Sequence, residues 1–229
     1  SVFITGGGSG IGAALTEAFL RQGAKVAFCQ RSDATPFCDA MERATGNRPL
    51  FLPCDIAVTD QLQLTLATAA KAHGPITTLV NNAANDQRHD TLKTDQAFWD
   101  WSIDVNLRSY FFACQSVIPG MQAAGGGSII NFSSISFMMA DTGYAAYITA
   151  NAGIIGLTRT LAREFGPDRI RVNAIAPGWV LTDRQKQLWV TPDALASHLA
   201  RQCLPDPILP ADMAGAVLFL AADASRMMT

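Results

Sequence analysis

The feature that most constrains the fold is an N-terminal unit made of a short apolar run, a glycine-rich turn and a helical pattern. The run Val2 to Thr5 is β-branched and aromatic, the turn Gly6 to Gly12 reads GGGSGIG, and the helical pattern continues to about Gln22. Between a strand and a helix, such a turn lets the backbone approach a pyrophosphate, which the unpaired N–H groups at the helix N-terminus can bind. Taken alone, a glycine-rich turn is also consistent with a purely structural role.

The rest of the chain alternates between apolar runs and helical patterns. The predicted strands are 2–5, 25–30, 50–54, 76–80, 128–132 and 170–175, and the predicted helices after the first are 33–46, 59–73, 96–124, 143–165 and 210–222. Because helices separate consecutive strands, the strands should lie parallel in a doubly wound α/β fold of three layers. No linker divides the 229 residues, so we expect one domain over 1–229. The stretch 178–208 interrupts the alternation and is predicted to be an inserted helical lid.

Composition and charge narrow the range of partners. Seventeen basic and nineteen acidic side chains give a net charge of -2 without a basic stripe, so nucleic acid is not expected as a partner. No apolar run approaches the roughly 20 residues that span a bilayer. The five cysteines form no C-x-x-C pair, which fits reduced thiols, and the three histidines lack metal-ligand spacing. We therefore expect a cytoplasmic protein that has no metal site and does not associate with membranes.

A second pattern carries candidate chemistry. Ser134 lies thirteen residues before Tyr147, and Asn151 lies four residues after it. Residues four apart on a helix share a face, so the phenol and the amide should point into the same space. A phenol titrates at about pH 10, so proton exchange at neutral pH needs a hydrogen-bonding partner and usually a nearby cation. Ser134 suits the first role. On these residues alone, Tyr147 could also be a packed helix residue and Ser134 a strand-end cap.

Together with further segments, these patterns resemble the short-chain dehydrogenase/reductase family. Thr5 to Gly12 matches the family pattern T-G-x-x-x-G-x-G, and Ser134 and Tyr147 match its catalytic serine and tyrosine. The other similar segments are Cys54-Asp55-Ile56, Asn81-Asn82-Ala83-Ala84, Asp104-Val105-Asn106, and Pro177-Gly178 followed by Thr182. The motifs occur in the family's order and extend along the whole chain.

The resemblance implies a Rossmann-type, NAD(P)-dependent oxidoreductase. It assigns catalytic roles to Ser134, Tyr147, Asn106 and Asn151, with Asn106 holding a proton relay through water. It also implies a homo-oligomer, a tetramer or dimer that packs through the helical regions 96–124 and 143–165. The cofactor-binding residues implied are Gly6, Ser9, Gly10, Ile11, Gly12, Arg31, Asp55, Ile56, Asn82, Ala83, Tyr147, Asn151, Pro177, Gly178, Val180 and Thr182.

Asn151 departs from the family pattern, which has a lysine four residues after the tyrosine. In the family, that lysine binds the ribose of the nicotinamide nucleotide and lowers the pKa of the tyrosine. An amide can bond a ribose hydroxyl but carries no charge, so phenolate at Tyr147 loses electrostatic support. Three explanations are open: an engineered or natural loss of activity, an error in the sequence, or rescue by a nearby cation such as Arg88 or Arg184.

The end of the second strand bears on which nicotinamide cofactor is bound. An acidic residue there would accept bonds from the ribose 2′-hydroxyl and repel a 2′-phosphate. This chain has Gln30-Arg31-Ser32 instead, and Arg31 could pair with a phosphate, which favours NADP. The alternative is that Arg31 is a solvated cation and Asp33 serves the ribose.

The substrate is predicted from two segments that look like those of the family's sugar dehydrogenases, which oxidise aldoses at C1. One is Asn85 to His89 (NDQRH), and the other is the lid. A monosaccharide needs amide groups for its hydroxyls and an aromatic face for its C–H side. The predicted substrate-binding residues are Asn85, Ser134, Trp179, Gln185 and Trp189.

Other interpretations of the same residues stay open. The lid tryptophans could simply anchor the lid to the core. Within enzymes, the runner-up is a reductase of a keto substrate of the 3-oxoacyl type, although amides and tryptophans suit a long acyl chain poorly. In a different class, the chain is a cofactor-binding scaffold or sensor whose active site has lost its lysine.

Overall fold

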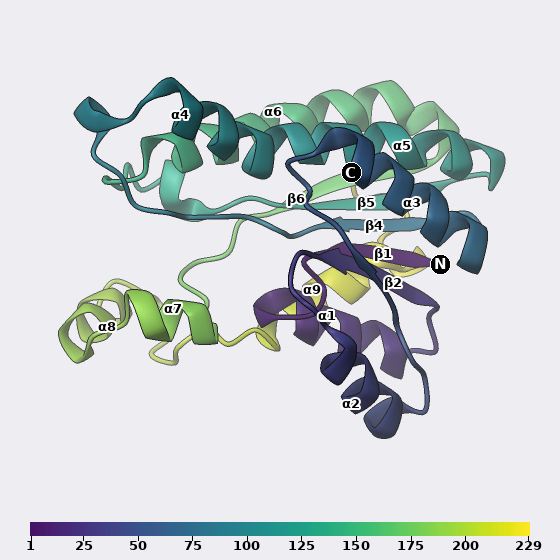
Figure 1. Cartoon of the computed structure of the whole chain (residues 1–229), viewed down its shortest axis with the longest axis horizontal. Coiled ribbons are helices and arrows are strands. Elements are labelled where there is room, and N and C mark those ends of the chain that lie inside the picture. The colour runs from purple at the N-terminus through teal and green to yellow at the C-terminus, as the bar shows by residue number, and fades with distance from the viewer.

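A parallel sheet of six strands forms the centre of the molecule (Figure 1). The computed structural model describes all residues, 1–229. The strands follow the order β3-β2-β1-β4-β5-β6, and every neighbouring pair is parallel. They are β1 (Val2–Thr5), β2 (Val26–Gln30), β3 (Leu50–Pro53), β4 (Thr78–Asn81), β5 (Gly127–Phe132) and β6 (Ile170–Ile175). The doubly wound fold predicted from the alternation of strands and helices is therefore confirmed.

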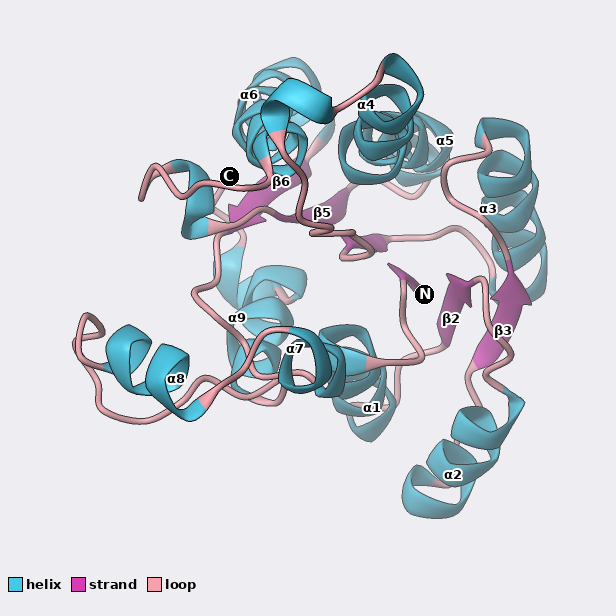
Figure 2. Ribbon diagram, turned by 60° about the vertical axis from the view of Figure 1, so that its left-hand side comes forward, coloured by secondary structure: helices cyan, strands magenta, loops and turns pink.

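Helices cover both faces of the sheet (Figures 1 and 2). One face carries α1 (Gly10–Arg21), α2 (Thr35–Thr45) and α9 (Asp212–Ala221), and the other carries α3 (Thr59–His73), α4 (Gln96–Ile103), α5 (Ser109–Ala123) and α6 (Ala145–Phe165). The single helical region predicted over 96–124 is instead divided by a π-helical turn, Asp104–Arg108. Such turns shift the register of the residues that follow, and they are frequent at functional sites. None of the helices is both long and apolar enough to cross a bilayer.

Side chains of the strands alternate between two hydrophobic cores. In β1, Phe3 points into the core formed with α3 and α5, whereas Val2 and Ile4 belong to the core formed with α1 and α9. Because both faces are covered, the strand reads as a continuous apolar run with no polar side, and its four residues are all buried.

The strand order reverses direction between β1 and β4, whose C-terminal ends open a crevice above the sheet. The lid lies beyond this edge and contains two short helices, α7 (Asp183–Leu188) and α8 (Pro192–Leu199), as predicted for 178–208 (Figure 1). A bridge between Val180 and Ile208 closes the base of the lid.

Candidate active site

One large cavity lies between the C-terminal ends of the strands and the lid. Its volume is about 810 Å³, within the usual range for a small-molecule site. Ser134, Tyr147 and Asn151 all line it, so the predicted catalytic pattern is assembled in one place. Of the predicted cofactor and substrate residues, the following also line it: Ile11, Asn82, Pro177, Gly178, Val180, Thr182, Trp179, Gln185 and Trp189.

Tyr147 lies in the first turns of α6, where the helix starts at the cavity wall. Burial raises the pKa of its phenol to about 12; the Ser134 hydroxyl opposes this rise, and the negative charge of Asp86 adds to it. Ser134 Oγ accepts the backbone N–H of Ser136 at 3.2 Å, so its own O–H is available to donate into the cavity. The pair thus places a hydroxyl that can orient a ligand beside a phenol whose pKa is raised.

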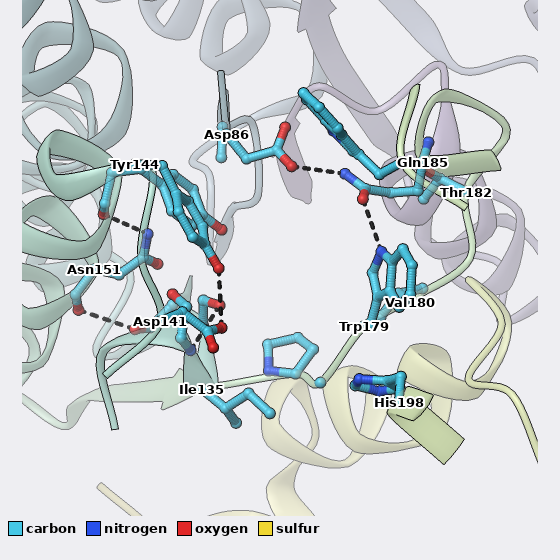
Figure 3. Close-up of a pocket in the computed structure, with 18 of the residues that line it drawn as sticks. Asp86, Ile135, Asp141, Tyr144, Asn151, Trp179, Val180, Thr182, Gln185 and His198 are labelled. Carbon is cyan, nitrogen blue, oxygen red and sulfur yellow. Dashed lines mark hydrogen bonds between the residues drawn. The ribbon is translucent and has the colours of Figure 1, made fainter. Parts of the chain in front are cut away.

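Asn151 turns part of its side chain back to its own helix. The amide Nδ2 donates to the backbone carbonyl of Tyr147 at 2.9 Å, and Ser133 Oγ donates to the backbone carbonyl of Asn151 at 2.9 Å (Figure 3). The residue is 3% exposed, at the edge of the cavity. Its Oδ1 keeps free acceptor capacity for a hydroxyl, whereas no positive charge stands at this position.

The glycine turn leaves backbone N–H groups without side-chain partners at the start of α1. Ser9 at the N-cap makes no side-chain hydrogen bond to the helix, and the first turn has no acidic residue. The N–H groups there are free to bind phosphate oxygens. Gly12 must be glycine, because a Cβ at this position would lie 1.9 Å from the carbonyl oxygen of Gly6. Gly10 has a φ of +52° and lies next to Thr182, so the turn meets the lid segment.

The residues that follow β2 and β3 surround the expected adenosine end. Gln30 Oε1 accepts the N–H of Gly8 at 3.1 Å, and Gln30 Nε2 donates to the carbonyl of Ser32 at 3.1 Å. Arg31 is exposed and forms no ion pair. Asp33 Oδ1 accepts both the N–H and the hydroxyl of Thr35, which lowers the pKa of Asp33. One of the two Asp33 carboxylate oxygens, Oδ1, is thus engaged at the start of α2.

Beyond β3 and β4, the predicted residues mainly hold the backbone. Asp55 Oδ1 accepts the N–H of Ala57 at 3.0 Å, and Ile56 packs in the core. Asn82 donates its side-chain amide to the carbonyl of Thr5 at 2.9 Å, and the N–H groups of Asn82 and Ala83 donate to the hydroxyl of Thr5. These bonds hold the chain after β4 against the end of β1, beside the glycine turn.

Asn106 and Asn85 bond to each other and do not line the cavity. The Asn106 side chain lies in the π-helical turn, accepts the N–H of Asn85 at 2.8 Å and donates to its carbonyl at 3.1 Å. Asn85 Oδ1 accepts the N–H of Gln87 at 2.9 Å. The relay role of Asn106 and the substrate role of Asn85 stay predictions, and both side chains have structural bonds.

A hydrogen-bonded chain connects the lid to the loop after β4. Trp179 Nε1 donates to Gln185 Oε1 at 2.8 Å, and Gln185 Nε2 donates to Asp86 Oδ2 at 2.8 Å (Figure 3). Arg184 pairs with the other oxygen of Asp86 at 3.2 Å. The Trp179 ring also contacts His198 of α8, edge to face at 5.4 Å. Trp179, Gln185 and His198 of the lid thus form one preorganised wall of the cavity with Asp86, which Arg184 also holds.

Sequence reasoning selected Asn85 from the NDQRH segment, whereas the structure brings Asp86 and Arg88 to the cavity. The chain after β4 is extended, and alternate residues along it face the cavity: Asn82, Ala84, Asp86 and Arg88. The two-residue period of extended chain was the signal that could have found them.

Tyr144 is a second phenol that sequence reasoning missed. It is buried, its ring stacks on Tyr147 with centroids 5.5 Å apart, and its hydroxyl donates to Asp141 at 3.0 Å. The Arg88 guanidinium lies 3.5 Å from the centre of the Tyr144 ring. Of the two cations considered for rescue, Arg88 is thus held on Tyr144 and Arg184 on Asp86.

Comparison with known proteins places the chain in a family. A family model described as enoyl-(acyl carrier protein) reductase matches residues 6–229. The chain is 47% identical over 230 residues to the probable galactose dehydrogenase GalD of Rhizobium meliloti (strain 1021), covering all of this chain and 90% of that protein. It is 45% identical over 229 residues to the D-xylose 1-dehydrogenase of Caulobacter vibrioides (strain NA1000 / CB15N), with the same coverage.

The fold gives the same result. The structure of a short-chain type dehydrogenase/reductase from Mycobacterium ulcerans matches with a TM-score of 0.94 and 25% identity, over 100% of this chain and 85% of that one. These matches run from one end of the chain to the other, and so include the glycine turn, the serine and tyrosine, and the lid. The chain belongs to the short-chain dehydrogenase/reductase family of NAD(P)-dependent oxidoreductases.

Proposed function

We propose that this protein oxidises an aldose or a similar polyol, at C1 in an aldose, with NADP as the preferred cofactor and with Asn151 limiting the rate. The observation that carries the proposal is that Ser134 and Tyr147 share one cavity with Trp179 and Gln185 of the lid. The names of two relatives support it, since one is a probable galactose dehydrogenase and the other a D-xylose 1-dehydrogenase.

Residues of the cavity and of the neighbouring glycine turn would together hold a nicotinamide nucleotide. The uncapped N-terminus of α1 suits the pyrophosphate, and a side chain at Gly12 would fill the space that the turn keeps open. Pro177, Gly178 and Thr182 line the cavity near Tyr147 and would hold the nicotinamide end. When bound, the nicotinamide supplies the hydride acceptor for oxidation of the substrate.

Tyr147 and Ser134 handle the proton in this reaction. Ser134 donates its hydroxyl to the reacting oxygen, which fixes that oxygen beside the phenol. Tyr147 as phenolate removes the substrate's hydroxyl proton. Because the pKa of Tyr147 is raised to about 12, the phenolate is scarce at neutral pH, and we expect slow turnover. Asn151 accepts a ribose hydroxyl through Oδ1, and it cannot supply the charge that would lower this pKa.

The preference for NADP rests on three side chains at the end of β2 and directly after it. Gln30 stands where an acidic residue would repel a 2′-phosphate, and its amide is bonded to Gly8 and Ser32. The Arg31 guanidinium is exposed and unpaired, as a phosphate ligand has to be before binding. Asp33, the candidate for binding a 2′-hydroxyl, already accepts two bonds from Thr35.

Recognition of a sugar is supported by the mixture of aromatic faces and bonded polar groups in the cavity. Trp179 and Trp189 offer apolar faces, and the Ser136 hydroxyl is buried in the wall without a partner. Gln185 keeps one N–H free after bonding Asp86. These groups bind hydroxyls, and they suit the acyl chain of a 3-oxoacyl substrate poorly.

The rival function is a cofactor-binding scaffold or sensor with little turnover, and one observation favours it. Asn151 puts no cation beside Tyr147, and the phenol has a raised pKa. The scaffold predicts normal affinity for NADP⁺ and negligible oxidation of any sugar.

One experiment separates the two functions. Reduced cofactor is followed by absorbance with D-xylose, L-arabinose, D-galactose and L-fucose, for the natural chain and for Asn151→Lys, with Asn151→Gln as the uncharged control. Slow oxidation by the natural chain and faster oxidation by Asn151→Lys support the proposal. Oxidation by Asn151→Lys alone would identify the natural chain as the scaffold, and no oxidation by either would refute the sugar substrate.

A further inference from the structure

Proton transfer at Tyr147 does not explain why a carboxylate, Asp86, lies in the same cavity. Its carboxylate lines the cavity that holds Tyr147, and its negative charge contributes to the raised pKa of that phenol. A catalytic tyrosine that must become phenolate is therefore opposed by this neighbour. If Asp86 served only the reaction at Tyr147, a neutral residue would serve better.

The carboxylate is fixed on one side and available on the other. Gln185 Nε2 occupies one site on Oδ2 at 2.8 Å, and Arg184 occupies one on Oδ1 at 3.2 Å. A carboxylate has about four acceptor sites, so about two are left. The side chain is 16% exposed, and Figure 3 shows it between the Tyr144 side of the cavity and the lid. It can therefore take two more hydrogen bonds from a ligand without moving.

The surrounding contacts set its orientation before any ligand arrives. The amide of Gln185 accepts from the indole of Trp179 and donates to Asp86, which fixes the direction of both bonds. Gln185 and Arg184 are the side chains that donate to Asp86, and together they do not saturate its acceptor sites. Two neighbouring hydroxyls of a polyol supply that pair of donors, whereas a ketone or an acyl thioester supplies none.

We propose that Asp86 is the specificity-determining residue of the cavity and binds two neighbouring hydroxyls of a polyhydroxy substrate. The inference rests on the proposed function, because it names how that same site selects a sugar. It adds an anionic anchor that accepts hydroxyl protons on the side of the cavity formed by the lid. Hydrogen bonds to a charged acceptor contribute more than neutral ones, so the anchor should dominate affinity.

The test measures sugar binding without turnover. Trp179 and Trp189 line the cavity, so titration of D-xylose or D-galactose into the protein with saturating NADP⁺ is followed by tryptophan fluorescence. Asp86→Asn keeps an oxygen for Gln185 and removes the charge. We expect sugar affinity to fall about tenfold to a hundredfold. Asp183→Asn is the matched control, since the Asp183 side chain is 94% exposed on α7. The sugar affinity of this variant should equal that of the natural chain.

A third variant distinguishes an anchor from a latch for the lid. Arg184→Gln breaks the ion pair and leaves the carboxylate in place. If Asp86 binds hydroxyls directly, this variant binds sugar nearly as well as the natural chain. If Asp86 only holds the lid, Arg184→Gln and Asp86→Asn weaken binding equally, and the inference is refuted. Thermal midpoints and NADP⁺ affinities of all variants show whether the fold and cofactor site are intact.

The outcomes also separate this inference from the proposed function. If sugar binds more weakly to Asp86→Asn as described but is not oxidised, the role of Asp86 is supported and the proposed enzymatic function is refuted. If the natural chain oxidises sugar and Asp86→Asn binds sugar equally well, the role of Asp86 is refuted and the proposed enzymatic function is supported. A natural chain that binds no sugar overturns both.

Discussion

The side-chain amide of Asn151 donates to the backbone carbonyl of Tyr147, one helical turn before it, at 2.9 Å. The bond uses one of the two N–H donors of the amide on its own helix, and the uncharged Asn151 places no cation beside the Tyr147 phenol. A lysine at this position carries a positive charge, and its longer side chain would extend the ammonium into the cavity that Asn151 lines. We therefore expect Asn151 to be the main limit on catalysis.

We expect Asn151→Lys to raise kcat for aldose oxidation by about 10²-fold, because an adjacent positive charge stabilises the phenolate. Steady-state rates with NADP⁺ at a fixed pH measure the change. Asn151→Gln has nearly the same length without the charge and should stay at the rate of the natural chain. Equal rates for the lysine and glutamine variants would show that charge at this position is not what limits turnover.

The pH dependence of oxidation follows from the raised pKa of Tyr147, about 12. The active form is deprotonated, so its fraction grows about tenfold per pH unit below that pKa. We expect kcat/KM of the natural chain to keep rising from pH 7 to 10. In Asn151→Lys, the curve should level off at lower pH. A plateau below pH 9 in the natural chain would contradict the raised pKa.

Most of the fold could be predicted because its signals are local. The glycine turn, the apolar runs and the helical periods all act within a few residues of chain, and they gave every strand to within two residues at its start. The division of 96–124 could not be predicted this way. Asn106 in the π-helical turn is tied to the backbone of Asn85, a partner 21 residues away that no helical period reveals.

Site residues that belong to a sequence motif could be predicted. Residues that reach the site only through the packing around the cavity were harder to predict. Ser134 and Tyr147 meet because the strand end and the helix start are set by the fold. Asp86 and Arg88 depend on which side of an extended loop faces the lid, and Tyr144 depends on stacking against Tyr147. Such contacts arise from the packing of segments that are distant in sequence, so motif spacing alone did not select them.

Gly12→Ala should abolish cofactor binding and lower stability. The new Cβ would lie 1.9 Å from the carbonyl oxygen of Gly6, so the helix and the turn have to separate. Overpacking of this kind commonly costs about 1–3 kcal/mol. Gly215→Ala in α9 is the matched control, since its Cβ meets nothing within 4 Å, and it should be neutral or stabilising. Denaturant midpoints and NADP⁺ titrations compare the two variants. Normal NADP⁺ affinity in Gly12→Ala would refute the expectation that the cofactor needs the close contact between Gly12 and Gly6.

Alkaline pH should destabilise the protein through the phenols of Tyr110 and Tyr147. Burial raises the pKa of Tyr110 strongly, and that of Tyr147 to about 12, whereas an unfolded tyrosine titrates at about 10. The folded state therefore binds more protons, so this stability is complete below pH 10 and is lost as the pH rises toward the folded pKa values. Urea midpoints at pH 8 and 10.5 measure it. Tyr110→Phe should show a smaller drop, and an equal drop would exclude Tyr110 as a source.

Cofactor choice provides the sharpest test of the adenosine end. Arg31 is exposed, so its guanidinium is free to pair with the 2′-phosphate that distinguishes NADP⁺ from NAD⁺. We expect Arg31→Ala to weaken NADP⁺ binding about tenfold to a hundredfold and to leave NAD⁺ binding unchanged. Arg21→Ala removes an equal charge from α1, where Arg21 pairs with Glu17, and should alter neither affinity. If the natural chain binds NAD⁺ more tightly than NADP⁺, Arg31 is a solvated loop cation. The ribose hydroxyls would then be bound by other groups, for which Asp33 Oδ2 is the candidate, since both bonds from Thr35 go to Oδ1.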